Sequence, residues 1–330
     1  MVFLCLKIIR SNRLPSVLRE NHVFEPRHWQ YRQAALLSEP VPFRVLYSGE
    51  GMGARKGKGK AMNKTKIDWC DSTWNPVTGC LHGCEYCYAR GIAKRFGGAN
   101  DGETSYEGEA LWTFEGEENG QNHVLDYPYK WYSDDGNTER NAPYPFYFDP
   151  TFHRYRLNDY TGKKGRNIFV CSMADLFGDW VPDEWIEAVF DACKKAPQHN
   201  YLFLTKNPKR YKELEEKGIL RCMSNMWFGF TNTKTGEYGN VFLLPENVKT
   251  FVSIEPLLEP LSPYITTDWI IIGAETGRRK NKVIPKREWI EQIVEDYRKY
   301  EIPIFMKSSL ADIWGGPLIQ EFPKELDRGE

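Results

Sequence analysis

The chain has 330 residues, of which 41% are hydrophobic, and its formal net charge is −1. This is enough for one large α/β domain or for two smaller ones. No stretch approaches the ~18 to 20 consecutive apolar residues of a membrane-spanning helix, and the apolar residues 1–6 are too few for a secretory signal. We therefore expect a cytoplasmic protein that makes no contact with a membrane.

The near-zero net charge hides an uneven distribution along the chain. Residues 1–61 contain eleven Lys or Arg and four Asp or Glu, whereas residues 62–330 contain 33 and 41. An acidic body argues against a broad phosphate-binding surface, although it is compatible with a local basic groove.

Residues 1–61 show no sustained helical or strand period and end in a run of glycine and lysine at residues 51–60. This composition predicts a flexible basic tail. Because the character of the sequence changes at Met62, we expect Met62 to be the native start and the tail to be translated upstream sequence. The alternative is a basic arm that grips nucleic acid.

The most informative stretch of the chain follows, in residues 79–88, where Cys80, Cys84 and Cys87 have the spacing CxxxCxxC. Thiolates hold iron–sulfur clusters at their iron corners, so three of them would leave one iron of a [4Fe-4S] cluster open. Gly79 and Gly83 would let the chain bend tightly between the sulfurs. The spacing therefore indicates a cluster-binding loop.

Two other interpretations of these cysteines stay open at this point. The thiols could be ordinary buried side chains, although packing does not require this spacing. They could also bind zinc together with His82 or Cys70, which would make the protein a non-enzymatic, zinc-stapled recognition module. The remaining cysteines are scattered, as expected for ordinary thiols, and favour a reducing compartment over a disulfide framework.

A helix is expected at residues 88–96, and from residue 165 onward short apolar runs alternate with helical patterns, which is typical of βα units. We expect a strand before Cys80 and six further strands, with three helices among them. The strands are predicted at residues 167–171, 201–204, 226–230, 250–254, 269–272 and 302–306, and the helices at 182–195, 208–216 and 285–300. About seven strands suit a partial barrel, and an open doubly wound sheet is the alternative.

Residues 97–165 interrupt this rhythm with a long segment rich in glycine, acidic residues and aromatic residues. Its aromatic density argues against full disorder. We expect an insertion that packs over the mouth of the barrel as a lid. The predicted organisation is thus a tail at 1–61, a barrel at 62–312 containing the 97–165 insertion, and a C-terminal tail at 313–330.

Polar residues follow most of the predicted strands, where the site of a parallel α/β fold forms. Such residues are common because loops face water, but acidic ones inside a barrel mouth need partners. Asp175, Glu255 and Glu275 are the acidic candidates. The neighbouring polar or small candidates are Ser172, Thr231, Asn232 and Gly273.

The cysteine loop, the helix after it and the repeated βα units resemble the radical SAM superfamily. Residues 67–76, 152–157, 168–178, 203–208, 253–258 and 269–277 resemble an uncharacterised, phage-associated branch of it. The resemblance covers residues 66 to 310 and implies a partial parallel (βα) barrel of the radical SAM type with a long insertion after the first helix.

The resemblance implies an enzyme that binds a [4Fe-4S] cluster through Cys80, Cys84 and Cys87 and S-adenosylmethionine at the fourth iron. Tyr86 would lie near the adenine. Where the superfamily holds the amino group with a Gly-Gly-Glu motif, this chain has residues 172–175, so Ser172 or Asp175 would substitute. Thr231, Asn232 and Glu255 would contact the ribose, and Gly273 and Glu275 belong to the same binding site.

The implied reaction begins with an electron from a low-potential donor and produces a 5′-deoxyadenosyl radical that removes hydrogen from a substrate. The cofactor carries this chemistry and the protein positions it and excludes water. The resemblance does not identify the substrate or the catalytic residues that contact it. A nucleic acid or a nucleotide is one candidate.

Overall fold

The computed structural model describes residues 65–97, 122–132, 139–236, 244–245, 247–261 and 266–327. The chain divides after Lys58, and all described residues belong to the part from Gly59 to Glu330. Residues 1–61 and Met62 lie outside the described residues, so the tail and the proposed start stay predictions. No helix among the described residues is long and apolar enough to cross a membrane.

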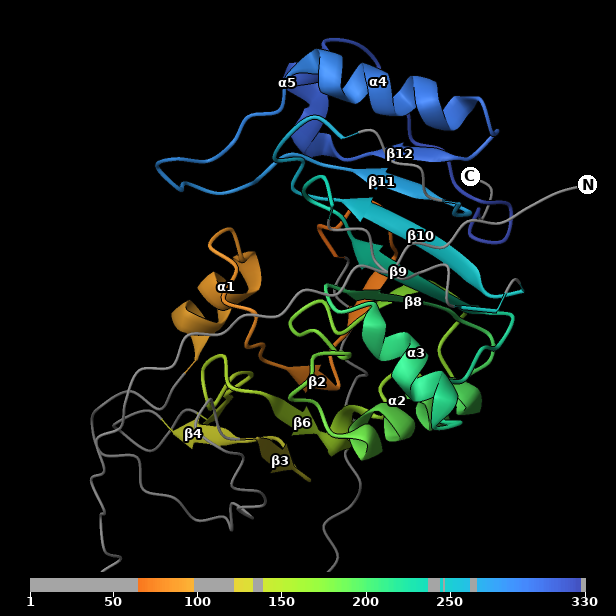
Figure 1. The fold of residues 1–330 in the computed structure, drawn as a ribbon. Coiled ribbons are helices and arrows are strands. Elements are labelled where there is room, and N and C mark those ends of the chain that lie inside the picture. The colour runs from red at the N-terminus through yellow and green to blue at the C-terminus, as the bar shows by residue number, and fades with distance from the viewer. Residues whose placement is uncertain are drawn as a thin grey trace, which may run out of the picture. The chain divides into compact units, whose positions relative to one another are not determined.

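Seven parallel strands form the main sheet, which curls into a half-barrel (Figure 1). Their order in space is their order in the sequence, so the sheet never reverses direction as a doubly wound sheet does. The strands are β1 (Ser72–Trp74), β7 (Asn167–Val170), β8 (Asn200–Thr205), β9 (Met226–Thr231), β10 (Lys249–Ile254), β11 (Ile270–Ile272) and β12 (Ile304–Met306). The predicted α/β partial barrel is confirmed at this level.

Helices cover one face of this sheet. The covering helices are α2 (Asp183–Lys195), α3 (Lys209–Glu216) and α4 (Arg287–Arg298), with the single turn α5 (Ala311–Trp314) next to α4. Helix α1 (Tyr88–Phe96) instead packs through Ala89 and Ala93 against Phe148 and Met173. Alternate strand residues such as Ile168, Val170 and Phe203 pack in one cluster with buried residues of α2 and α3. A second cluster joins Ile270, Ile304 and other strand residues to α4.

The opposite, concave face of the sheet is filled by large side chains. Phe169, Leu202, Trp227, Phe251 and Phe305 form one buried cluster, since they alternate with the residues that face the helices. Gly229 makes room for this packing, because a Cβ there would lie 2.4 Å from the Phe251 ring. The cluster closes the lower part of the half-barrel, so the space above it is the part left for a site.

Two small sheets lie in and beside the segment predicted as an insertion. β2 (Val77–Thr78), β6 (Thr151–His153) and β3 (His123–Leu125) form one, and β4 (Lys130–Tyr132) and β5 (Glu139–Asn141) form the other. β2 pairs antiparallel with β6 immediately before the cysteine loop. The described part of the insertion therefore pairs with the strand that leads into that loop. Residues 98–121 and 133–138 lie outside the described residues, so the lid stays a prediction.

The C-terminal segment differs from the tail predicted for residues 313–330. The backbone N–H of Met306 donates to Ile319 (2.6 Å), and the indole N–H of Trp269 donates to the carbonyl of Glu321 (3.0 Å). Leu326 is buried in the concave cluster, where Phe322 also packs. Scattered apolar residues without a regular period carry this packing, which is why the sequence pattern missed it.

Candidate functional site

The cysteine loop is attached to the sheet at its first residues. Gly79 donates its backbone N–H to the carbonyl of Met173 (2.9 Å), and Cys80 donates to that of Phe148 (3.1 Å). Gly79 has φ +89 and Gly83 has φ +70, and both values lie in the left-handed region that favours glycine. The glycines therefore shape the loop as the sequence predicted.

The last cysteine of the loop begins α1. The Cys87 thiol accepts the backbone N–H of Arg90 at 3.4 Å and so caps the helix, while the Arg90 guanidinium donates to the carbonyl of Cys80 at 3.2 Å. Arg90 thus holds the first and last cysteines of the loop in a fixed relation. Burial raises the pKa of the Cys80 thiol to about 12.

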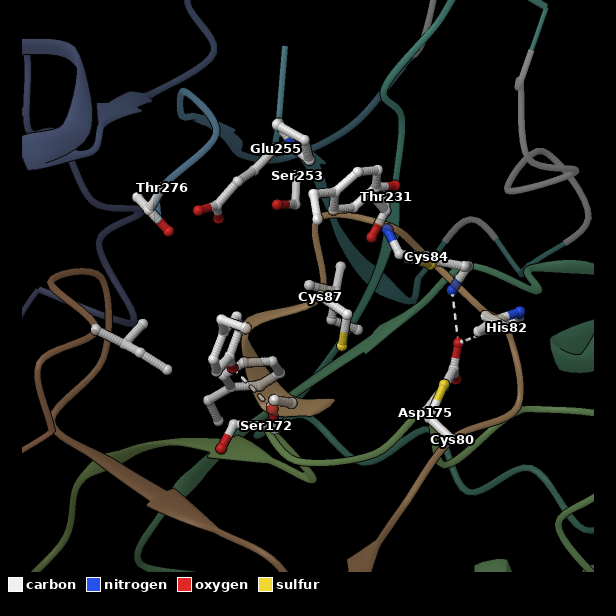
Figure 2. A pocket seen from close by; sticks show the side chains of 18 of the residues that line it. Cys80, His82, Cys84, Cys87, Ser172, Asp175, Thr231, Ser253, Glu255 and Thr276 are labelled. Carbon is white, nitrogen blue, oxygen red and sulfur yellow. Dashed lines mark hydrogen bonds and ion pairs between the residues drawn. The ribbon is translucent and has the colours of Figure 1, made fainter. Parts of the chain in front are cut away.

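All three cysteines line one cavity of about 180 Å³ at the carboxyl ends of the strands (Figure 2). Apolar side chains form much of its wall, including Trp69, Phe148, Phe169 and Leu204. Of the residues that the sequence singled out for a cofactor, the cavity includes Tyr86, Ser172, Asp175, Thr231, Glu255 and Glu275. Asn232 and Gly273 do not line it.

Three hydroxyl groups are available in this cavity. Thr231 ends β9, Ser253 lies in β10 and Thr276 follows β11, and Figure 2 shows them on the upper side of the cavity, across from Ser172. Among the described residues, none of the three side chains has a hydrogen-bond partner. They can therefore accept or donate to a bound polar ligand.

Asp175 is already occupied by the protein. Its carboxylate accepts from His82 Nε2 (2.8 Å), from the backbone N–H of Lys206 (2.8 Å) and from that of Phe177 (3.0 Å). The predicted contact of this carboxylate with an amino group is therefore not what the geometry favours. Asp175 instead connects the cysteine loop, through His82, to the loops after β7 and β8.

Ser172 is partly engaged as well. Its hydroxyl donates to the side-chain oxygen of Asn75 (3.1 Å), and its carbonyl accepts from the Tyr88 hydroxyl (2.7 Å). The Ser172 hydroxyl retains its lone pairs for a ligand, since it acts only as a donor here. Tyr86 also lies in the cavity wall, where the Lys206 ammonium is 5.3 Å from the centre of its ring.

Glu255 forms an ion pair with Lys307 across the ends of β10 and β12. Gly273 makes room for this pair, because a Cβ there would lie 3.0 Å from Lys307 and 3.2 Å from Glu255. Gly273 was predicted to contact a cofactor, and its visible contribution is this space. The pair places one positive and one negative charge at the cavity wall.

Glu275 forms a two-point ion pair with Arg279, with both distances at 2.7 Å. The hydrogen bond from Arg279 is the main cause that holds the pKa of the Glu275 carboxyl below its usual value. Arg279 also reaches Glu85 in the cysteine loop at 3.1 Å. Because Glu85 and Arg279 are 194 residues apart in the sequence, no local pattern could predict this contact.

Asn232 is fully buried, and neither the oxygen nor the nitrogen of its side-chain amide has a hydrogen-bond partner among the described residues. An unsatisfied buried amide is unfavourable by roughly 1–3 kcal/mol. The predicted ribose contact is not visible for this residue, which lies next to Thr231 but outside the cavity wall. The cavity is also lined by residues that the sequence did not single out for a cofactor, namely His82, Ser253, Thr276, Lys206 and Lys307.

The cysteines do not form a ready site for a single metal ion. Within the described part of the chain, no three His, Cys, Asp or Glu side chains are grouped closely enough to hold one ion. His82, the candidate fourth zinc ligand, is hydrogen-bonded to Asp175 instead. A four-iron cluster needs each thiolate at a different iron, whereas a zinc ion needs its ligands around a single point.

The fold and the cavity define a half-barrel α/β protein with a cysteine-lined pocket at its carboxyl edge. The family model for a protein of unknown function, DUF5131, matches residues 64–317, and the chain belongs to this family. The predicted membership of the radical SAM superfamily and its phage-associated branch is therefore wrong, because the family that matches is a different one. Comparisons with curated proteins and with solved structures found no match.

Proposed function

We propose that the protein is an enzyme that binds a [4Fe-4S] cluster through Cys80, Cys84 and Cys87 and binds S-adenosylmethionine in the same cavity. The observation that supports this most is the joint presence, around one cavity, of three thiols and three hydroxyls that have no hydrogen-bond partner among the described residues. When bound and reduced, the cluster would supply an electron that splits the sulfonium of S-adenosylmethionine into methionine and a 5′-deoxyadenosyl radical.

The chain's own residues have distinct roles in this proposal. The hydroxyls of Thr231, Ser253 and Thr276 bind polar groups of the cofactor, and the aromatic face of Tyr86 supports its base. Lys307 and Glu255 offer a cation and an anion to its charged end. Asp175 is a positioning residue, since it fixes the loop through His82.

The apolar residues of the cavity wall have a separate role, which is to exclude water. Trp69, Phe148, Phe169 and Leu204 make an apolar wall, which protects a reactive radical from side reactions with solvent. The substrate supplies the hydrogen atom that the radical removes, and a low-potential donor outside this chain supplies the electron.

The test uses the full chain, purified without oxygen and reconstituted with iron and sulfide. After addition of dithionite and S-adenosylmethionine, chromatography should detect 5′-deoxyadenosine. The variant Cys84→Ala should lose cluster and product, because two thiols cannot hold the cluster in place. The control Cys222→Ala, at an exposed cysteine outside the loop, should keep both.

Two other results would change the conclusion. One zinc per chain with no iron would overturn the proposal and revive a structural zinc site. A complete cluster in the wild-type protein that forms no 5′-deoxyadenosine would restrict the function to cluster binding.

A further inference from the structure

The loop between β11 and α4 is strongly basic. Residues 278–287 contain six Lys or Arg and no Asp or Glu, although the part of the chain from residue 62 is acidic as a whole. The usual explanation of such a run is a solvated surface whose charges are paired with neighbouring carboxylates. The contacts of these residues decide whether that explanation holds.

Four of these six cations have no carboxylate partner among the described residues. Arg279 is paired with Glu275 and Glu85, Arg287 with Glu291, and Lys286 lies over the Trp289 ring. In contrast, Arg278, Lys280 and Lys282 are exposed, and no carboxylate among the described residues forms an ion pair with them. Their charges are therefore available to a bound anion.

Helix α1 presents a second set of cations together with apolar side chains. Lys94 and Arg95 are exposed and form no ion pair within the described ranges, and the Arg95 guanidinium lies 5.2 Å from the centre of the Phe96 ring. Tyr88, Ile92 and Phe96 recur at every fourth position and are 49%, 36% and 56% exposed. Exposed aromatic rings beside unpaired cations are the combination that binds unstacked nucleobases and their phosphates.

The two basic segments flank the same cavity. Thr276 and Glu275 at the base of the loop line it, and so do Tyr88 and Ala89 at the start of α1. The ion pair between Arg279 and Glu85 connects the loop to the cysteine segment at 3.1 Å. Figure 1 shows α1 and the β11–α4 loop projecting on the same side of the half-barrel.

We infer that the β11–α4 loop and α1 bind a single-stranded nucleic acid and bring one of its nucleotides to the cysteine-lined cavity. Arg278, Lys280, Lys282, Lys94 and Arg95 contact phosphates, and Tyr88 and Phe96 stack on bases. A flexible strand suits this surface because its bases are already accessible, whereas those of a duplex are stacked. The inference rests on the proposed function and names its substrate class.

The experiment measures binding of a fluorescein-labelled 20-nucleotide DNA strand, and of the RNA of the same sequence, to the full chain by fluorescence anisotropy over a salt series. The test variant is R278A/K280A/K282A. The matched control, K194A/K195A/R221A, removes three exposed cations, two in the last turn of α2 and one in the segment after α3. Unfolding temperatures of both variants should equal that of the wild type, since all six side chains are exposed.

The test variant should bind at least about tenfold more weakly at 0.1 M salt, and the slope of log K against log salt should fall by about 2, since each lost phosphate contact contributes about 0.7. The control should match the wild type. Equal binding by test variant and wild type would overturn the inference, and so would equally strong competition by polyglutamate, which would show a site for acidic polypeptides.

Failure of the inference can be told apart from failure of the proposed function, because binding is measured without iron or S-adenosylmethionine. A protein that forms 5′-deoxyadenosine but binds neither strand would refute only the inference of nucleic-acid binding. A protein that binds the strand through the loop but never holds iron would support the nucleic-acid inference and refute the proposed enzymatic function.

Discussion

At the scale of single residues, the cavity contains two kinds of polar side chain. Asp175 and Glu275 have their carboxylate oxygens filled by protein donors, so they hold loops together. Thr231, Ser253 and Thr276 line the same cavity and have no such partners in the part of the chain that the structure describes. A ligand can therefore form hydrogen bonds with these three hydroxyl groups without first displacing a contact within the protein.

His153 is a buried histidine whose titration should be visible in the stability of the protein. Its Nε2 lies 2.9 Å from the Thr78 hydroxyl and its Nδ1 lies 3.3 Å from that of Tyr155. Burial is the main cause that lowers its pKa well below the usual value, and the charge of Arg156 acts in the same direction. The folded protein therefore keeps this ring neutral.

Stability should fall with acidity because of this residue. As the pH drops below about 6.5, the unfolded chain takes up a proton on His153 before the folded protein does. This protonation stabilises the unfolded state relative to the folded state. Between pH 7.5 and 5.5 the wild type should lose roughly 1 kcal/mol more unfolding free energy than His153→Gln. Urea denaturation at the two pH values measures this.

His123 also has a lowered pKa, but it is present in both proteins and cancels in the comparison. Parallel losses in the wild type and the variant would show that His153 does not titrate in this range.

At the scale of elements, the cysteine loop depends on how its two glycines meet their surroundings. A Cβ at Gly79 would lie 2.1 Å from the carbonyl oxygen of Asp149, whereas a Cβ at Gly83 would meet nothing within 4 Å. Both residues have positive φ, so both substitutions strain the backbone by about 1–2 kcal/mol. Only the first also forces the β2 and β6 region apart.

Gly79→Ala should therefore lower the iron content per chain after reconstitution and the unfolding temperature more than Gly83→Ala does. Gly83→Ala serves as the matched control, because it carries the same backbone strain without the clash. Equal effects of the two substitutions would mean that loop strain alone, rather than contact with Asp149, determines cluster binding.

The sequence predicted the long elements better than the short ones. All six strands predicted after residue 165 exist within two residues of their observed bounds, because their residues are apolar on both faces. The β2–β6–β3 sheet was missed because its strands have two or three residues, too few for a period to appear.

The sequence predicted those features of the site that follow from the order of the strands. It did not predict those that depend on contacts between residues far apart in the sequence. Six of the eight predicted cofactor residues line the cavity, because parallel strands bring their carboxyl ends to one edge. The engagement of Asp175 by His82, 93 residues away, required the structure. The same holds for the contact of Glu85 with Arg279.

At the scale of the whole molecule, the half-barrel is completed by the C-terminal segment. Asn167 donates to the carbonyl of Leu326 (2.7 Å) and Asn200 to that of Glu325 (3.0 Å), so the segment covers the amino ends of β7 and β8. Phe322 packs on Trp269 with ring centres 5.5 Å apart. The lower end of the concave cluster is therefore closed by residues beyond the family match at 317.

A chain that stops after residue 312 should be destabilised by roughly 5 kcal/mol or more, since it loses the buried Leu326 and the partly buried Phe322 and Ile319. A chain that stops after residue 327 should keep the wild-type unfolding temperature. Thermal unfolding followed by circular dichroism compares the two. A stable protein of 312 residues would show that the concave cluster holds without its cover.

The same C-terminal segment has a further effect on β12, which is the last strand of an open sheet. The backbone of Ile304 accepts from Glu321 (2.9 Å), and Phe305 is bridged to Gln320 in antiparallel fashion. The free hydrogen-bonding groups of this edge are thus used within the molecule. Without these hydrogen bonds, the exposed edge of β12 could pair with the sheet of another molecule. The C-terminal segment therefore protects the protein from edge-to-edge aggregation.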